Sequence, residues 1–150
     1  MVYKWNPSYH AKANAQVAGE ICEELAAQNR LTAQELVDVS KPESAPLHDA
    51  FEWDNKVAGN EWRKYQARNM IRSLMIVRND QEPIKMYFNL EKKEPEYKSI
   101  ELILESESDY QKMLNNALRE LNSFRTKYEK LTELRPVFAA IEALEVEDSA

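Results

Sequence analysis

A histidine and three acidic residues lie close together in the chain, and their types are those used in acid–base and metal chemistry. They are His48, Asp49, Glu52 and Asp54. His48 and Glu52 are four residues apart, which places them on one face of a helix, where the pair could bind a divalent metal or transfer a proton. The simpler interpretation is an acidic cluster that stabilises a helix N-terminus and pairs with Arg68 or Arg72. We favour this second interpretation and predict no metal site.

Basic residues follow on the next predicted helix. Lys64, Arg68 and Arg72 recur at four-residue steps, and Arg63 lies alongside them. One interpretation is that this stripe folds against the preceding acidic residues or is a solvated face, since most surface charges contribute little. The other is a binding surface for phosphate or for an acidic partner. The functional predictions below depend on the second interpretation.

The residue types that enzymes and cofactor sites need are scarce. Gly19 and Gly59 are the only glycines, so no glycine-rich phosphate loop exists. One cysteine and two distant histidines cannot build a zinc site without carboxylates. No serine or cysteine has a histidine base placed beside it by the sequence. We therefore predict a protein that is not an enzyme, with no catalytic residue and no cofactor.

The composition is that of an acidic folded protein. Its 150 residues are 43% hydrophobic and have a net charge of −6, which argues against nucleic-acid binding over the whole surface but allows a local basic patch. The single cysteine, Cys22, excludes an internal disulfide and fits a reducing compartment. No apolar run approaches the roughly 18–20 residues that span a bilayer, and the first residues lack the apolar core of a signal peptide. These features predict a cytoplasmic protein without a membrane segment.

The elements that position the charged residues form a helical lobe over residues 1–74. Residues 1–13 are rich in aromatics and are expected to pack on the domain as an arm without regular structure. A first helix is predicted from Asn14 to about residue 29. A second begins after Thr32, which has capping-box spacing to Glu35, and ends before Pro42.

Two further helices complete an outline that resembles a helix-turn-helix module. The first is short and covers PLHDAFEW; the second runs from about Asn55, after a cap at Asp54, into the low seventies, with Trp62 and Tyr65 on its apolar side. The short helix would be the recognition helix, but it carries acidic residues and no cation, whereas helices that read bases present Arg, Lys, Asn or Gln. The predicted arrangement of helices is therefore that of a DNA-binding module, whereas the predicted recognition helix lacks the residue types that read bases.

Residues 75–150 are predicted to form a small sheet and a long helix, which makes the fold class α+β with one core shared by both lobes. Alternating apolar residues indicate strands near residues 74–78, 84–90 and 100–104, a three-stranded antiparallel meander. Ser106 or Ser108 would cap the long helix, and a short helix follows Pro136. The long helix has a heptad seam of Tyr110, Leu114, Ala117, Leu121, Phe124, Tyr128 and Leu131. This seam either packs on the chain's own sheet or pairs with the same helix of a second copy.

The run PLHDAFEWDNKVAGNEWRKYQARNMIRSL, residues 46–74, resembles a motif of small proteins from tailed phages and prophages. The resemblance rests on Leu47, His48, Phe51, Glu52, Trp53, Asp54, Gln66, Ala67, Arg68, Ile71 and Arg72. The helical segment before this motif and the sheet and helix after it are also similar, so the likeness covers most of the chain. It implies a phage origin and no established activity, and it carries over no catalytic residue.

These observations lead to one functional prediction and one alternative. The first is a non-enzymatic phage accessory protein that acts as a protein-interaction or oligomeric adaptor in the cytoplasm of the bacterial host. Its partner would be a host or phage protein, or a second copy in a dimer. The alternative is a DNA-associated regulator that contacts phosphate through Arg63, Lys64, Arg68 and Arg72.

Overall fold

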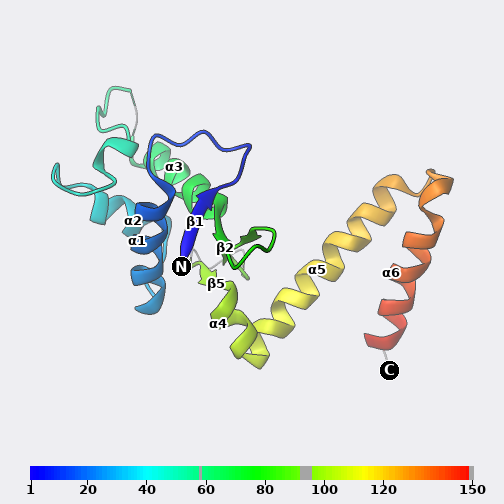
Figure 1. The fold of residues 1–150 in the computed structure, drawn as a ribbon. Helices are drawn as coiled ribbons and strands as arrows, with labels where there is room; N and C mark the ends of the chain where they lie inside the picture. Colours follow the sequence, from blue (N-terminus) through cyan, green and yellow to red (C-terminus); the bar gives the residue numbers. More distant parts are fainter. Residues whose placement is uncertain (58, 92–95, 149–150) are drawn as a thin grey trace. The chain divides into compact units, whose positions relative to one another are not determined.

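The computed structural model describes residues 1–57, 59–91 and 96–148. The α+β class predicted from the sequence is confirmed: a helical N-terminal lobe, a three-stranded antiparallel sheet and a long C-terminal helix are all present. The chain divides into two compact units, Met1–Leu102 (unit 1) and Ile103–Ala150 (unit 2), whose elements are labelled in Figure 1.

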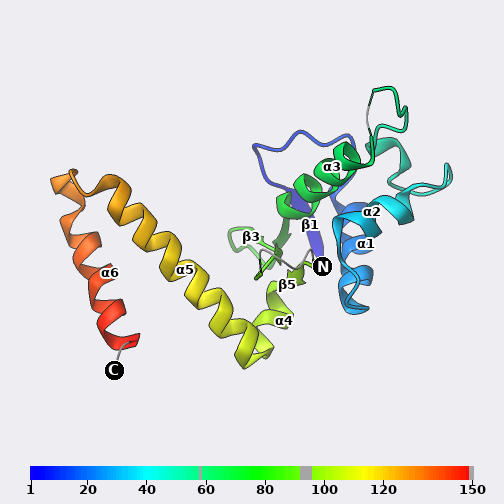
Figure 2. The same ribbon diagram turned by 180° about the vertical axis from the view of Figure 1, so that it is seen from behind.

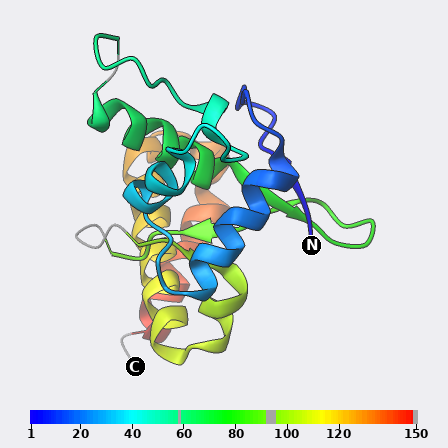
Figure 3. The same ribbon diagram turned by 90° about the vertical axis from the view of Figure 1, so that its left-hand side faces the viewer.

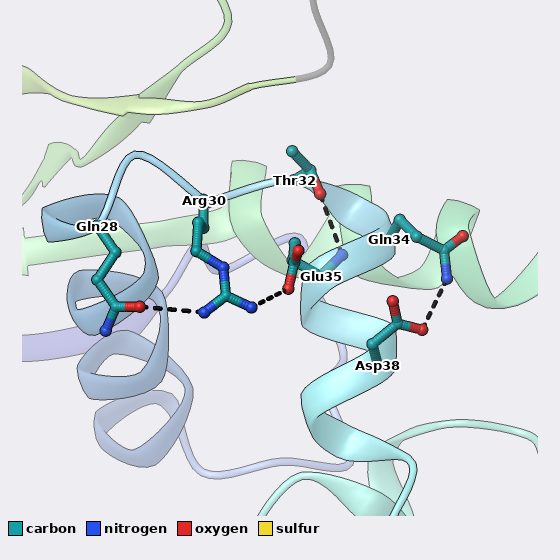
Figure 4. Close-up of polar contacts among 6 residues, drawn as sticks. All are labelled: Gln28, Arg30, Thr32, Gln34, Glu35 and Asp38. Carbon is teal, nitrogen blue, oxygen red and sulfur yellow. Dashed lines mark hydrogen bonds and ion pairs between the residues drawn. The ribbon is translucent and has the colours of Figure 1, made fainter.

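Unit 1 opens with two capped helices, as predicted. Helix α1 (Ala15–Ala27) begins after Asn14, whose side chain accepts hydrogen bonds from two backbone N–H groups of the first turn. Helix α2 (Ala33–Ser40) begins after Thr32, whose hydroxyl accepts from the backbone N–H of Glu35 at 3.0 Å. The carboxylate of Glu35 does not complete a capping box; it pairs with Arg30 at 2.7 Å (Figure 4). Both caps therefore fix where the helices start.

The predicted recognition helix is not formed. Its residues adopt one 3₁₀ turn, η1 (His48–Ala50), and then extended backbone. Helix α3 (Asn60–Ser73) also starts later than predicted, after Gly59 rather than Asp54. Asp54 instead accepts a hydrogen bond from the backbone N–H of Lys56 and stabilises a turn. Ala58, inside the predicted helix, lies outside the described residues.

The N-terminal residues form a strand, so the prediction of an irregular arm was wrong. Strand β1 (Val2–Trp5) pairs antiparallel with β2 (Leu74–Val77), with Tyr3 opposite Ile76. Strand β3 (Ile84–Lys85) pairs with the other edge of β2, giving the sheet order β1-β2-β3. The predicted lobe boundary between residues 74 and 75 would divide this sheet.

The other predicted strands differ from the observed elements. Residues 84–90 give two short strands instead of one, because β4 (Tyr87–Phe88) leaves the first sheet and pairs with β5 (Lys98–Ser99). The segment predicted as the third strand is helical, as α4 (Ile100–Glu105). Part of the predicted turn before it, residues 92–95, lies outside the described residues.

The core of unit 1 joins its sheet to the helices that come before it. Helix α1 lies against β1 (Figures 1 and 3), and the ring of Tyr3 covers Gly19 so closely that a Cβ at this position would be 2.2 Å from the ring. Leu36 of α2, Ile71 of α3 and Ile76 of β2 are buried in the same cluster. Within unit 1, α1 and α3 lie against the strands and α2 packs on α3.

Unit 2 is a helical hairpin. Helix α5 (Glu107–Tyr128) is capped by Ser106, whose hydroxyl accepts from the backbone N–H of Asp109 at 3.3 Å. A 3₁₀ turn, η2 (Thr132–Leu134), leads into α6 (Arg135–Asp148). The two helices meet near this turn, where the rings of Phe124 and Phe138 lie 6.3 Å apart. They diverge away from the turn (Figures 1 and 2).

Candidate functional site

His48, the strongest catalytic candidate in the sequence, is held by structural contacts. Its ring stacks on Trp53 with centroids 5.0 Å apart, and its Nδ1 lies 3.1 Å from the backbone oxygen of Ser40. The indole Nε1 of Trp53 donates to the backbone oxygen of His48 at 2.7 Å. The guanidinium of Arg63 lies over the same indole, 5.4 Å from its centroid. These contacts give His48 a packing role in the loop that connects α2 to α3.

The acidic residues near His48 serve the backbone of this loop. The Glu52 carboxylate accepts from the backbone N–H of Asp54 at 3.0 Å, and the Asp54 carboxylate accepts from that of Lys56 at 2.9 Å. Asp49 is exposed on η1. Within residues 1–57, 59–91 and 96–148, no three side chains of the types His, Cys, Asp or Glu are grouped so that they could bind a metal ion. The arrangement offers turn stabilisation and no evident acid–base pair.

The predicted basic stripe is divided in the structure. Arg63 points towards the preceding loop, where its Nη1 donates to Asn55 Oδ1 at 3.0 Å and lies 3.4 Å from the backbone oxygen of Glu52. Lys64, Arg68 and Arg72 are four residues apart and therefore share one face of α3, whereas Arg63 lies on a different face. The grouping of Arg63 with the stripe is therefore corrected: Arg63 fastens the loop to α3.

Of the remaining three cations, one is paired on its own helix. Lys64 Nζ lies 2.8 Å from Glu61 Oε1, and this hydrogen bond and its charge lower the pKa of the Glu61 carboxyl. Arg68 is half-buried and Arg72 is exposed in the last turn of α3. Neither arginine forms a salt bridge with a residue in the described part of the chain. The predicted alternative, in which the acidic loop neutralises these arginines, is not observed there.

Two aromatic residues join the arginines on the outside of α3. Trp62 and Tyr65 are 51% and 50% exposed, and their rings stack with centroids 5.2 Å apart and planes 23° apart. They lie on the same side of the helix as Arg68 and Arg72, within a third of its circumference at 100° per residue. We call these four residues the α3 outer face.

The sequence prediction placed Trp62 and Tyr65 on the buried side, which is wrong. The buried residues of α3 are Ala67, Met70 and Ile71. The side of the helix that packs on the core is therefore the side that carries these three residues. The sequence contained a signal that was missed. Trp62, Tyr65 and Arg72 recur at helical steps on the side of α3 opposite the buried Ala67, Met70 and Ile71.

A small cavity lies beside the loop but has no clear ligand preference. It measures about 200 Å³ and is lined by residues of α2, the loop and the start of α3, among them Asp38, Lys41, Trp53 and Arg63. Both signs of charge line it, and Asp38 accepts a hydrogen bond from Gln34 (Figure 4). Its charged lining residues are two cations, Lys41 and Arg63, and one anion, Asp38, and Arg63 is already engaged with Asn55. This small excess of positive charge does not by itself identify a ligand.

The remaining titratable cluster of unit 1 is in the core. Burial raises the pKa of the Cys22 thiol to about 12, and it also raises the pKa values of the Tyr3 and Tyr87 hydroxyls above their ordinary value. Tyr3 also donates to Glu23 Oε2 at 2.9 Å, which adds to the rise in its pKa. At neutral pH these groups stay protonated, so Cys22 lacks the thiolate that a nucleophile needs.

The membrane prediction and the family resemblance have different outcomes. In the described ranges, no helix combines the length with the apolar character that crossing a bilayer requires. The likeness of residues 46–74 to phage and prophage proteins stays a prediction, because no family model, no curated protein and no solved structure matches this chain.

Proposed function

We propose that this protein is a non-enzymatic adaptor that binds an acidic segment of a partner protein through the α3 outer face. One observation carries the proposal. A stacked, half-exposed pair of aromatic rings, Trp62 and Tyr65, lies on the same side of α3 as two arginines that form no salt bridge with a residue in the described part of the chain. Folding of this chain alone does not account for aromatic rings and guanidinium groups left together on the outside of a helix.

The composition of this face matches that of protein-binding hot spots. Trp, Tyr and Arg are the residues that most often dominate binding energy at interfaces. The stacked rings offer rigid apolar area, and a guanidinium group can bind a carboxylate through two parallel hydrogen bonds. Because the protein has a net charge of −6, a cationic face on one helix favours an acidic segment that would be repelled elsewhere.

Nucleic acid is the second candidate, for a specific reason. Aromatic rings next to cations also suit single-stranded nucleic acid, where bases stack on the rings and phosphates meet the cations. The footprint is small, however, since Arg63 is engaged with the loop and Lys64 with Glu61. We rank this candidate below an acidic protein segment because the overall negative charge opposes phosphate binding at long range.

The biological setting completes the proposal. A phage accessory protein that acts in the cytoplasm of its bacterial host would meet both host and phage proteins. The support for this setting is the resemblance of residues 46–74 to phage proteins, together with the single cysteine, which fits a reducing compartment.

Fluorescence titration of the full chain tests the α3 outer face. The probes are a synthetic peptide of alternating acidic and apolar residues, a single-stranded DNA oligonucleotide and a duplex of the same length. A fluorescent label on each probe reports binding through its anisotropy, so that variants without Trp62 can be measured. We expect Trp62→Ala to weaken peptide binding by at least about 1 kcal/mol. The double variant Arg68→Glu with Arg72→Glu should weaken it by at least about tenfold.

The matched control is Lys4→Glu with Lys12→Glu, which makes the same charge change at exposed positions outside α3 and the loop before it. Equal loss of binding in the two double variants would mean that only net charge matters and would reject the site. Tighter binding of either oligonucleotide than of the peptide, with a steep decrease in salt, would favour the nucleic-acid candidate.

A further inference from the structure

We propose that unit 2 is a dimerisation element, in which the α5 helices of two copies of this chain pack antiparallel against each other. This proposal is independent of the binding function of the α3 outer face. It starts from the heptad seam, which runs along α5 to Tyr128 and continues to Leu131 just beyond it. Tyr128 is partly buried, and the other large side chains remain 37–48% exposed: Tyr110, Leu114, Leu121, Phe124 and Leu131.

The hairpin does not cover these side chains by itself. Helix α6 buries Phe138 and Ile141, but its Val137 and Leu144 are about as exposed as the seam. The helices diverge away from η2 (Figures 1 and 2), so the described residues of α6 do not run alongside the first half of α5. Two helices of this size bury too little apolar surface to be stable alone. Another helical surface has to complete their core.

The spacing of the seam suits a helix as its occupant. Its residues are separated by alternating steps of four and three, which keeps one side of α5 facing a partner helix over about three heptads. An antiparallel pair with its twofold axis near residue 119 places Ala117 opposite Leu121 and Leu114 opposite Phe124. The small Ala117 then faces the larger Leu121 in the two central layers. Tyr110 lies opposite Tyr128 in the outer ones, so an apolar or aromatic side chain faces another in every layer.

The charges of α5 select the antiparallel orientation and a second copy of this chain. Its first turn is acidic, with Glu107, and its last turn is basic, with Lys127, followed by the highly exposed Lys130. Parallel helices would place like charges together. Antiparallel helices place the acidic end of each beside the basic end of the other, so α5 is complementary to itself.

A dimer would also change what the other unit can do. Two copies would present two α3 outer faces in one particle. A partner with two acidic segments would then bind more tightly than one face allows, without any new contact.

Sedimentation of the full chain tests the proposal. From about 1 to about 100 μM, the range that reveals micromolar association, we expect a monomer–dimer equilibrium. Leu121→Glu should weaken the dimer by at least about a hundredfold, because it buries a charge in the seam. Arg119→Glu is the matched control and should leave the equilibrium unchanged, since this position lies on the side of α5 opposite the seam.

A charge exchange distinguishes a specific loss of dimerisation from unfolding of the chain. Lys130→Glu and Glu107→Lys should each weaken dimerisation by about threefold to tenfold, and the double variant should restore it. A chain that stays monomeric over the whole range, or a dimer that Leu121→Glu leaves intact, would overturn the proposal. So would a monomer in which Leu121→Glu lowers the stability of unit 1, because the seam would then be covered by the same chain.

Discussion

The two units of this protein differ in how far their apolar side chains are buried. Unit 1 buries most of its large apolar side chains in one core, which includes Tyr3 in β1 and Tyr87 in β4, although Trp62 and Tyr65 of the α3 outer face stay half-exposed. Unit 2 repeats its apolar residues just as regularly along α5, yet most of them stay partly exposed. The difference teaches that regular apolar spacing indicates a face that will be covered and does not indicate what covers it.

The contrast follows from topology. In unit 1, strands from distant parts of the sequence and three helices enclose a common core, so most apolar faces meet another. In unit 2, a hairpin supplies only two helices, and these diverge. Stability in unit 1 is therefore expected to depend on contacts within the chain, whereas stability in unit 2 should depend on association.

The largest expected effect comes from the closest contact in unit 1. Gly19→Ala adds a methyl group that would lie 2.2 Å from the Tyr3 ring. Alanine favours a helix by about 1 kcal/mol over glycine, but overpacking of this severity should outweigh that gain and destabilise unit 1 by about 3 kcal/mol or more. Urea unfolding followed by circular dichroism measures the change, and near-neutral behaviour would contradict the contact.

The chain offers a matched control for this substitution. Gly59, which precedes α3, has open space where a Cβ would lie, so Gly59→Ala should cost less than about 1 kcal/mol. Combining Gly19→Ala with Tyr3→Ala should cost less than the sum of the single changes, because the second removes the ring that the first collides with. Additive costs would show that the ring and the methyl group do not meet.

The next effect is a loss of stability in alkali that belongs to unit 1. Burial raises the pKa values of Tyr3, Cys22 and Tyr87 above their ordinary values of 10.0, 9.0 and 10.0. Below pH 9 these groups are protonated in both the folded and the unfolded chain. Above pH 9 for Cys22 and above pH 10 for the two tyrosines, the unfolded chain loses protons that the folded chain retains. Stability then falls by about 1.4 kcal/mol per pH unit for each group that has passed its unfolded-chain pKa.

Unfolding in urea between pH 7 and pH 11 checks this window. Tyr3→Phe should remove the contribution of one group, so that stability falls less steeply as the pH rises. The substitution also removes the hydrogen bond to Glu23. Constant stability up to pH 11 would mean that the phenols and the thiol reach solvent in the folded state.

The smallest effect compares equivalent caps in the two units. Thr32 caps α2 and Ser106 caps α5, each through a hydroxyl that accepts from a backbone N–H three residues later. Substitution of either by alanine should cost about 1 kcal/mol. Hydrogen exchange should show the loss in α2 for Thr32→Ala and in α5 for Ser106→Ala. A loss that spreads from one unit to the other would contradict their division into two.

Local signals in the sequence predicted the starts of α1, α2 and α5. Asn14, Thr32 and Ser106 are caps because their side chains act on backbone groups two or three residues away, and such effects are visible in one sequence. Strand β1 was missed because its partner, β2, is distant in the sequence. Residues 100–104 were assigned to a strand because short apolar runs fit both periods, and the helix there buries Ile103.

The candidate site was predicted in part. The four-residue steps placed Arg68 and Arg72 together on the outside of α3, as observed. The position of Arg63 depends on Asn55 and Trp53 in a folded loop, which no periodic pattern encodes. Trp62 and Tyr65 were misassigned because aromatic residues usually mark a buried face, and their exposure is the exception that makes the α3 outer face a candidate site.

The pairing of β1 with β2 has a consequence for synthesis on the ribosome. Strand β1 emerges before α1, α2 and α3, and its partner residues 74–77 emerge only after all three helices. During that interval its backbone N–H and C=O groups have no sheet to join, and an unpaired strand is prone to bind other extended chains. Fast completion of residues 60–77 therefore shortens the period in which the nascent protein is most exposed to aggregation and most dependent on chaperones.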